Sequence, residues 1–263
     1  MTTLIEAMLE TARVMGVVKE GTATGGSTTT LIDTGLDDPA GYFTKGTLWI
    51  LSGTYSGTCD VVKMFNEGTF TLTATLAGAI VAGITYAVAN SEYPKYKLKQ
   101  AVLSALRFAP ILKTNDTLTV TADTEEYSLP SGVSNVKRVD VAGSLTAPYA
   151  FVPNLHWKEW NGKLFFESGK EPSGTGLIIR LWYEGAHGEI AESGSILSSV
   201  DMNWLKWTSA AFLYRDLIKK IQKDNPTDID LLNEAKAFEA EAKQNAARGE
   251  LISMPSDPKI AGW

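Results

Sequence analysis

At 263 residues the chain is long enough to bury a substantial core, and one to three domains are expected. Its 44% hydrophobic and 21% charged residues are ordinary for a globular protein and argue against wholesale disorder. The net charge of −6 disfavours sequence-independent binding of duplex DNA, because such binding depends on Lys and Arg side chains that neutralise phosphates.

The first predicted element is a helix that begins at Thr3. Thr3 and Glu6 have the spacing of a capping box, in which each side chain accepts a hydrogen bond from the backbone of the other residue. An apolar stripe at helical spacing follows, formed by Leu4, Met8, Ala12 and Met15. Gly16 or Gly21 is expected to end this helix.

A β-rich block follows over residues 22–90, with many Thr and Gly residues and few charges. Turn signals divide it into five predicted strands, at 28–33, 46–51, 58–64, 69–73 and 84–89. Short strands at this spacing favour a small barrel or sandwich. The most apolar stretch, 76–88, is too short to span a membrane.

A second helix is predicted from Ser91, with Pro94 in its first turn and Pro110 at its end. Its buried face is expected to contain Leu98, Ala101, Val102, Ala105 and Leu106. A second β-domain then spans 116–186. Within it, Asn161-Gly162 predicts a tight hairpin, because both residues tolerate the positive φ angles of a type I′ turn.

Two further helices are predicted, one opening at Ser199 and one at Thr227, joined by a short turn into an antiparallel hairpin. Gly249 is expected to end the last helix. The remaining residues, 250–263, form an extended tail, because Pro255 and Pro258 prevent a helix from continuing.

The predicted fold class is therefore α+β. Each helix has one apolar stripe that needs cover, so we expect the separated helices to assemble into a helical bundle core with the β-rich, barrel-like or sandwich-like blocks as insertions. The core is expected to include Trp204. The predicted core segments are 1–21, 91–110 and 197–249; the insertions are 22–90 and 116–186; the tail is 250–263.

Candidate catalytic motifs are weak. The stretch 23–28 contains Gly25-Gly26 but lacks the Lys and following helix of a phosphate loop, so a turn or linker is favoured. The two histidines, His156 and His187, lack the neighbouring Cys or His ligands of a zinc site. Glu192-Ser193-Gly194-Ser195 is not a nucleophile elbow. We expect no enzymatic activity, no cofactor and no metal.

Aromatic residues and the single cysteine remain to be placed. Trp157 and Trp160 would lie on opposite faces of a regular strand, so one of them is available to stack on a sugar or to contact a partner or another part of the chain. Cys59 is expected to be a small buried strand residue, and with no second cysteine it forms no intrachain disulfide.

Several segments resemble head-to-tail adaptor proteins, also called connector or neck proteins, of tailed bacteriophages. The segment 25–34, Gly-Gly-Ser-Thr-Thr-Thr-Leu-Ile-Asp-Thr, is similar to a β-insertion common among phage virion proteins. Other segments are similar to the rest of that insertion, to the adaptor's passage from helix into β-domain, and to its closing helical hairpin: 68–72 and 83–86, then 105–107 with 127–130, then 181–242.

This resemblance implies a structural virion protein without enzymatic activity. Such a protein forms a homo-oligomeric ring, usually a dodecamer, between the portal and the tail or a stopper, and lines part of the channel through which genomic DNA passes. Its partners would be the portal, other neck proteins and its own copies, with no membrane. Its location would be the virion neck, after assembly in the host cytoplasm. The alternative is a β-rich virion decoration or a module that binds glycan on the host surface.

Two expectations concern surfaces. Ile260 and Trp263 are expected to dock the tail on the portal or on an adjacent subunit, because aromatic anchors are enriched at interface hot spots. The alternative is that Trp263 folds back on its own helices. The net charges of 1–90, 91–197 and 198–249 are −4, −1 and zero, so the channel is expected not to hold DNA tightly.

Overall fold

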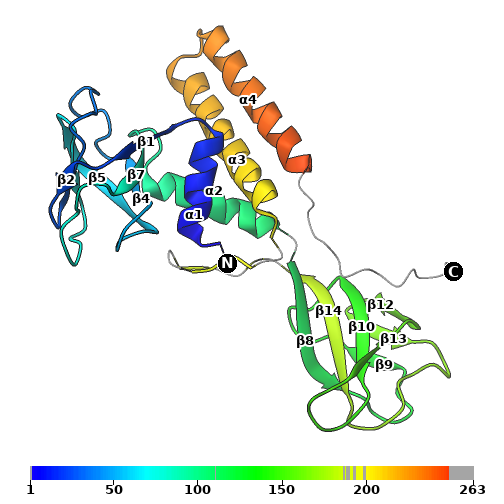
Figure 1. Cartoon of the computed structure of the whole chain (residues 1–263). Coiled ribbons are helices and arrows are strands. Elements are labelled where there is room, and N and C mark those ends of the chain that lie inside the picture. Colours follow the sequence, from blue (N-terminus) through cyan, green and yellow to red (C-terminus); the bar gives the residue numbers. More distant parts are fainter. Residues whose placement is uncertain are drawn as a thin grey trace. The chain divides into compact units, whose positions relative to one another are not determined.

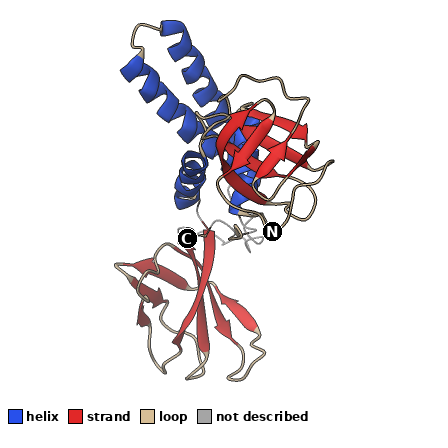
Figure 2. Ribbon diagram, turned by 90° about the vertical axis from the view of Figure 1, so that its left-hand side faces the viewer, coloured by secondary structure: helices blue, strands red, loops and turns tan. Residues whose placement is uncertain are grey.

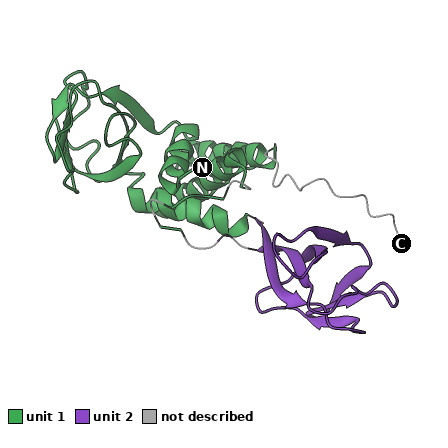
Figure 3. Cartoon of the chain, turned by 60° about the horizontal axis from the view of Figure 1, so that its bottom comes forward, with its two compact units in different colours: residues 1–109, 188–251 green, residues 110–187, 252–263 purple. Residues whose placement is uncertain are grey.

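The computed structural model describes residues 2–109, 111–185, 187, 190–191, 194–197 and 200–248. The chain divides into two compact units, coloured separately in Figure 3. Unit 1 contains residues 1–109 and 188–251, and unit 2 contains 110–187 and 252–263. The helices and the largest sheet belong to unit 1, whereas two smaller sheets form unit 2.

Unit 1 contains the four helices labelled in Figure 1: α1 (Leu4–Val14), α2 (Lys95–Phe108), α3 (Met202–Asp224) and α4 (Ile229–Arg248). The capping box at the start of α1 is confirmed, since Thr3 Oγ1 accepts from the Glu6 N–H at 3.2 Å and Glu6 Oε2 accepts from the Thr3 N–H at 2.8 Å. Helices α1, α2 and α3 contact one another, and α4 contacts α3. Trp204, in α3, is buried.

The predicted starts of three helices differ from those observed. Helix α2 begins at Lys95 with Pro94 as its N-cap, so Ser91 does not cap it. Asp201 caps α3, and Ser199 lies outside the described residues. At the start of α4 the Asp228 carboxylate, not the Thr227 hydroxyl, accepts a hydrogen bond from the Leu231 N–H, at 3.0 Å. In each case the residue that caps lies nearer the helix than the sequence pattern indicated.

The largest sheet is antiparallel and has the strand order β1-β7-β4-β5-β6-β3-β2. Its strands curl into a half-barrel, visible beside the helices in Figure 2. The strands are β1 (Val18–Thr22), β2 (Gly25–Gly26), β3 (Thr30–Ile32), β4 (Thr47–Ile50), β5 (Thr58–Asn66), β6 (Thr69–Leu72) and β7 (Thr85–Ala89). Five of them match the predicted strands, whereas β1 and β2 were not predicted.

Aromatic rings fill the concave side of this sheet. Phe65, Phe70 and Tyr86 are at most 1% exposed, and Phe43 is 2% exposed. Phe70 lies centrally, with ring centroids 4.8 Å from Phe65, 5.4 Å from Tyr86 and 5.6 Å from Phe43. Few apolar residues are needed to form this core, because each contributes a large buried area.

One polar pair is buried beside these rings. The Tyr86 hydroxyl donates to Asp33 Oδ2 at 2.8 Å, and burial together with this hydrogen bond raises the pKa of Tyr86. A Cβ atom at Gly21 would lie 2.6 Å from the Tyr86 Oη. The glycine is therefore required by the close approach of the tyrosine.

Unit 2 contains a four-stranded antiparallel sheet, β11-β10-β14-β8, and a three-stranded antiparallel sheet, β12-β13-β9. In the first sheet the opening strand β8 pairs with the closing strand β14, so that Ile111 lies opposite Gly185. The strands are β8 (Ile111–Thr119), β9 (Glu126–Ser128), β10 (Val136–Ala142), β11 (Phe151–Asn154), β12 (Trp157–Trp160), β13 (Lys163–Phe166) and β14 (Ile178–Gly185).

A polar cluster crosses one face of the four-stranded sheet. Asp140 is only 2% exposed, and it accepts hydrogen bonds from Arg138 Nε at 2.6 Å and from Trp182 Nε1 at 2.8 Å. Arg180 lies opposite Asp140 in the register and pairs with Asp116 through two hydrogen bonds of 2.8 and 2.6 Å. These side chains link strands β8, β10 and β14.

The prediction of a helical bundle core is wrong. Strands account for 31% of the described residues and helices for 28%, and the seven-stranded half-barrel and two smaller sheets dominate the structure. The apolar stripes of α1 and α2 identified the buried faces of these helices. On α4 the helical spacing also predicts that Leu231 and Phe238 face inward, but they are 39% and 42% exposed. The Thr- and Gly-rich block 22–90, predicted as an insertion, has its own core, to which Leu31, Phe65, Phe70 and Tyr86 belong.

Candidate functional site and interaction surfaces

The predicted weak motifs do not come together in one site. Gly25 and Gly26 lie in the hairpin of β2 and β3, where a Cβ at Gly26 would lie 2.3 Å from the Thr30 carbonyl oxygen. Cys59 lies in β5 and is half-buried rather than buried. Among the described residues, no group of three or more His, Cys, Asp or Glu side chains is arranged to hold a metal ion. Ser193 lies outside the described residues.

An exposed aromatic surface lies on the β12–β13 hairpin of unit 2. The turn residues Asn161 and Gly162 have φ angles of 52° and 72°, which confirms the predicted tight turn. Trp160 is 69% exposed, whereas Trp157 packs against the core of unit 2, so the prediction that the two lie on opposite faces is confirmed. Trp160 and Phe165 have ring centroids 6.3 Å apart.

Two lysines border these rings. Lys158 lies opposite Phe165 in the strand register, with its Nζ atom 5.9 Å from the ring centroid. Lys163 lies opposite Trp160 and forms an ion pair with Glu126 of β9. We call Trp160, Phe165, Lys158 and Lys163 the aromatic platform.

A cavity of about 510 Å³ adjoins the aromatic platform, and we call it the hairpin cavity. His156 Nδ1 lies 3.0 Å from Glu167 Oε2 at this cavity, and both side chains are 45% exposed. The backbone of His156 is fixed, because its N–H donates to Asn154 Oδ1 at 2.8 Å and its carbonyl accepts from the Glu167 N–H at 3.0 Å. The lining residues are His156, Trp157, Lys158, Phe165, Phe166, Glu167 and Ser168.

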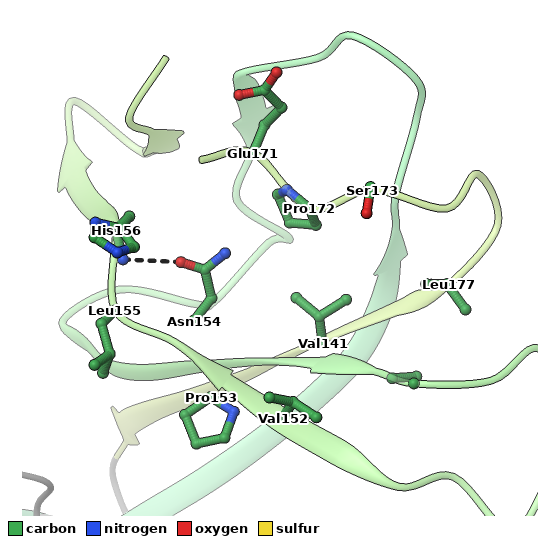
Figure 4. Close-up of a pocket in the computed structure, with 12 residues that line it drawn as sticks. Val141, Val152, Pro153, Asn154, Leu155, His156, Glu171, Pro172, Ser173 and Leu177 are labelled. Carbon is green, nitrogen blue, oxygen red and sulfur yellow. Dashed lines mark hydrogen bonds between the residues drawn. The ribbon is translucent and has the colours of Figure 1, made fainter. Parts of the chain in front are cut away.

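His156 also lines a second cavity of about 570 Å³, shown in Figure 4. Val152 and Pro153 of β11 lie on one side of it, and Pro172 and Ser173 lie on the other. The Asn154 side chain reaches toward His156 between them. His156, whose backbone is held by hydrogen bonds, thus lines both cavities.

Unit 1 presents a different kind of surface, in which two helices carry stripes of opposite charge. On α4, the residues Leu231, Glu234, Phe238 and Glu241 follow one another at steps of three and four and are all exposed. On α2, the corresponding face contains Tyr96, Lys99, Leu103 and Arg107. Tyr96 is 71% exposed, and α2 as a whole has four basic residues and no acidic one. We call these sets the α4 stripe and the α2 stripe. The α4 stripe is exposed, whereas Lys99 and Leu103 of the α2 stripe are half-buried.

Sequence reasoning identified Trp160 but missed the cavity and the stripes. The Asn161-Gly162 turn fixes the register of β12 against β13, and continuing that register by one pair places His156 beside Glu167. The stripes follow helical spacing, but their exposure depends on which faces α1 and α3 cover. Ile260 and Trp263, predicted to dock the tail, lie outside the described residues.

No protein family and no curated protein matches this chain. None of the helices in the part of the chain that the structure describes is long and apolar enough to cross a membrane.

Proposed function

We propose that this chain is a structural virion protein, a head-to-tail adaptor that assembles into a ring between the portal and the tail or a stopper. The resemblance of several segments to phage adaptor proteins supports this class of protein. The observation that carries the proposal is the pair of complementary stripes on α2 and α4. These stripes give each copy two different surfaces, one for each neighbour.

The stripes match in both polarity and charge. Because they lie on different helices, a contact between the α4 stripe of one copy and the α2 stripe of the next is heterologous. Heterologous contacts that close generate a cyclic ring. With the two helices parallel and in register, three pairs lie opposite one another: Leu231 and Tyr96, Glu234 and Lys99, Phe238 and Leu103. Arg107 lies one residue beyond the position opposite Glu241.

The charge of the chain suits a channel through which DNA passes without being held. Net charges of −4, −1 and zero over residues 1–90, 91–197 and 198–249 leave no excess of cations to neutralise phosphates. In this proposal Ile260 and Trp263 dock on the portal or on an adjacent subunit, and genomic DNA makes only transient contact with the ring.

Reversing the charge of the α4 stripe tests the ring. Mass measurement of the purified protein, alone and with portal rings, is expected to give an oligomer of fixed stoichiometry on the portal. The variant Glu234→Lys with Glu241→Lys places like charge opposite Lys99 and near Arg107, and it is expected to abolish that oligomer. Adding Lys99→Glu and Arg107→Glu to the same chain restores the charge match, and the oligomer should return.

The matched control is Lys236→Glu, an exposed charge reversal on α4 outside the stripe, which should leave assembly unchanged. A wild-type chain that stays monomeric in the presence of portal rings would contradict the proposed function. An oligomer that tolerates the reversed α4 stripe would show that the ring, if formed, uses another surface.

A further inference from the structure

We propose that the β12–β13 hairpin carries a saccharide-binding site, formed by the aromatic platform and the hairpin cavity. The two surfaces are continuous, because Lys158 and Phe165 belong to both. This site lies in unit 2 and does not depend on the helical stripes or on ring assembly. It therefore adds a binding activity to the proposed structural role.

The exposed tryptophan supplies the apolar part of the recognition. A pyranose ring has a face of C–H groups and an edge of hydroxyls, so it stacks on a flat aromatic side chain while its edge stays polar. Trp160 is 69% exposed and sits beside Phe165 on a hairpin whose turn has the geometry of a rigid two-residue loop. The turn thus defines the backbone that carries the platform before any ligand arrives, which reduces the entropy lost on binding.

The hairpin cavity supplies the polar part. Sugar hydroxyls both donate and accept hydrogen bonds, and they require both kinds of partner within one site. Lys158 offers donors, Glu167 offers acceptors, and Ser168 offers both. His156 is held 3.0 Å from Glu167, so its ring presents the remaining edge in a defined direction. A cavity of about 510 Å³ is within the range of small-molecule sites.

The charge of unit 2 separates a saccharide from a nucleic acid, the other ligand that stacks on aromatic side chains. Binding of single-stranded nucleic acid requires a cationic groove along the backbone. Residues 110–187 contain seven basic and nine acidic residues, a net charge of −2, and Lys163 is already paired with Glu126. The combination of stacking rings, mixed donors and acceptors, and no cationic excess favours a sugar.

Titration of the full-length protein with oligosaccharides tests the site. The probes are maltohexaose, cellohexaose, chitohexaose and a hyaluronan hexasaccharide. Binding is followed by calorimetry and by the difference in tryptophan fluorescence between the wild type and Trp160→Ala, since the chain has seven tryptophans. At least one probe is expected to bind with a Kd of about 1 mM or tighter. Trp160→Ala should weaken that binding about tenfold, as expected for the loss of one stacking contact, and Trp160→Phe should retain most of it.

Tyr149→Ala is the matched control, because Tyr149 is an exposed aromatic of unit 2 that lies outside the platform and the cavity. It should leave the Kd unchanged. Lys158→Ala, at the junction of platform and cavity, should weaken binding several-fold without changing the melting temperature. The proposal is overturned if none of the four probes binds, if Trp160→Ala binds as tightly as the wild type, or if an oligothymidine binds this surface more tightly than the sugars.

Discussion

The half-barrel of unit 1 buries most of its aromatic side chains, whereas most of those in unit 2 are at least partly exposed. Phe65, Phe70 and Tyr86 are buried in one cluster, whereas Trp160 and Tyr149 of unit 2 are 69% and 39% exposed. Burial of large rings stabilises a fold, whereas an exposed ring contributes little to stability. The half-barrel thus has a packed aromatic core, whereas the exposed ring of Trp160 belongs to the surface on which we propose that a saccharide binds.

Replacing one aromatic residue of each region with Ala should give the largest difference in the free energy of unfolding. Phe70→Ala removes a side chain that is 0% exposed and contacts three other rings, so it is expected to lower the free energy of unfolding by about 3–5 kcal/mol. Trp160→Ala should change it by less than about 0.5 kcal/mol, as for other exposed sites. Denaturant titration of both variants measures the difference. Equal losses would show that Trp160 is part of a core and would break the comparison.

The polar cluster of unit 2 predicts a smaller effect confined to that unit. Asp140→Ala leaves the Trp182 indole N–H and the Arg138 guanidinium without their acceptor, and it is expected to reduce stability by about 2 kcal/mol. Hydrogen exchange resolved by peptide should show faster exchange in β10 and β14 and no change in β4–β7. Faster exchange throughout the chain would mean that the two units unfold together.

Raising the pH above 10 should lower the stability of unit 1. Burial, with a smaller contribution from the Glu92 charge, raises the pKa of Tyr93 to about 12. A raised pKa means that the folded state favours the neutral hydroxyl, so this stabilisation is complete below pH 10 and is lost as the pH rises toward 12. Near pH 11 the loss amounts to about 1 kcal/mol.

Tyr93→Phe removes this titration and should flatten the fall in stability above pH 10. The measurement is the free energy of unfolding against pH for wild type and variant, with tyrosinate absorbance as the readout of ionisation. Tyr149→Phe serves as the exposed control. Identical pH profiles for wild type and Tyr93→Phe would contradict the assigned burial.

Local chemistry made much of the β-structure predictable. Turn residues placed most strands, and the Asn-Gly pair specified both the hairpin and the opposite orientations of Trp157 and Trp160. Strand β11 was missed because Pro153 lies within it, and Pro is tolerated there only because β11 is an edge strand. Strand β1 was not predicted, because it follows Gly16 and contains Gly21, the two residues expected to end the first helix.

The wrong prediction concerned the core, and its cause is physical. Periodicity identifies the buried face of a helix from residues that are neighbours in sequence. Which surface covers that face depends on contacts between distant segments, such as those of α1 with α3. Likewise, the His156–Glu167 pair was within reach of register arithmetic, but the size of the cavity beside it depends on how Trp157 and Phe166 pack.

The pairing of Ile111 with Gly185 bears on which segment of the chain can be replaced by a shorter or longer one. The segment 111–185 begins and ends on adjacent strands, so its two ends lie at neighbouring points. The half-barrel has the same property, since Val18 pairs with Ala89. Entropy of loop closure rises only slowly with length, so a segment with adjacent ends can be exchanged for a shorter or longer one without unravelling its host. Each β-block can therefore be replaced as a unit. A variant in which a short linker replaces residues 111–185 should still fold its helices and its half-barrel.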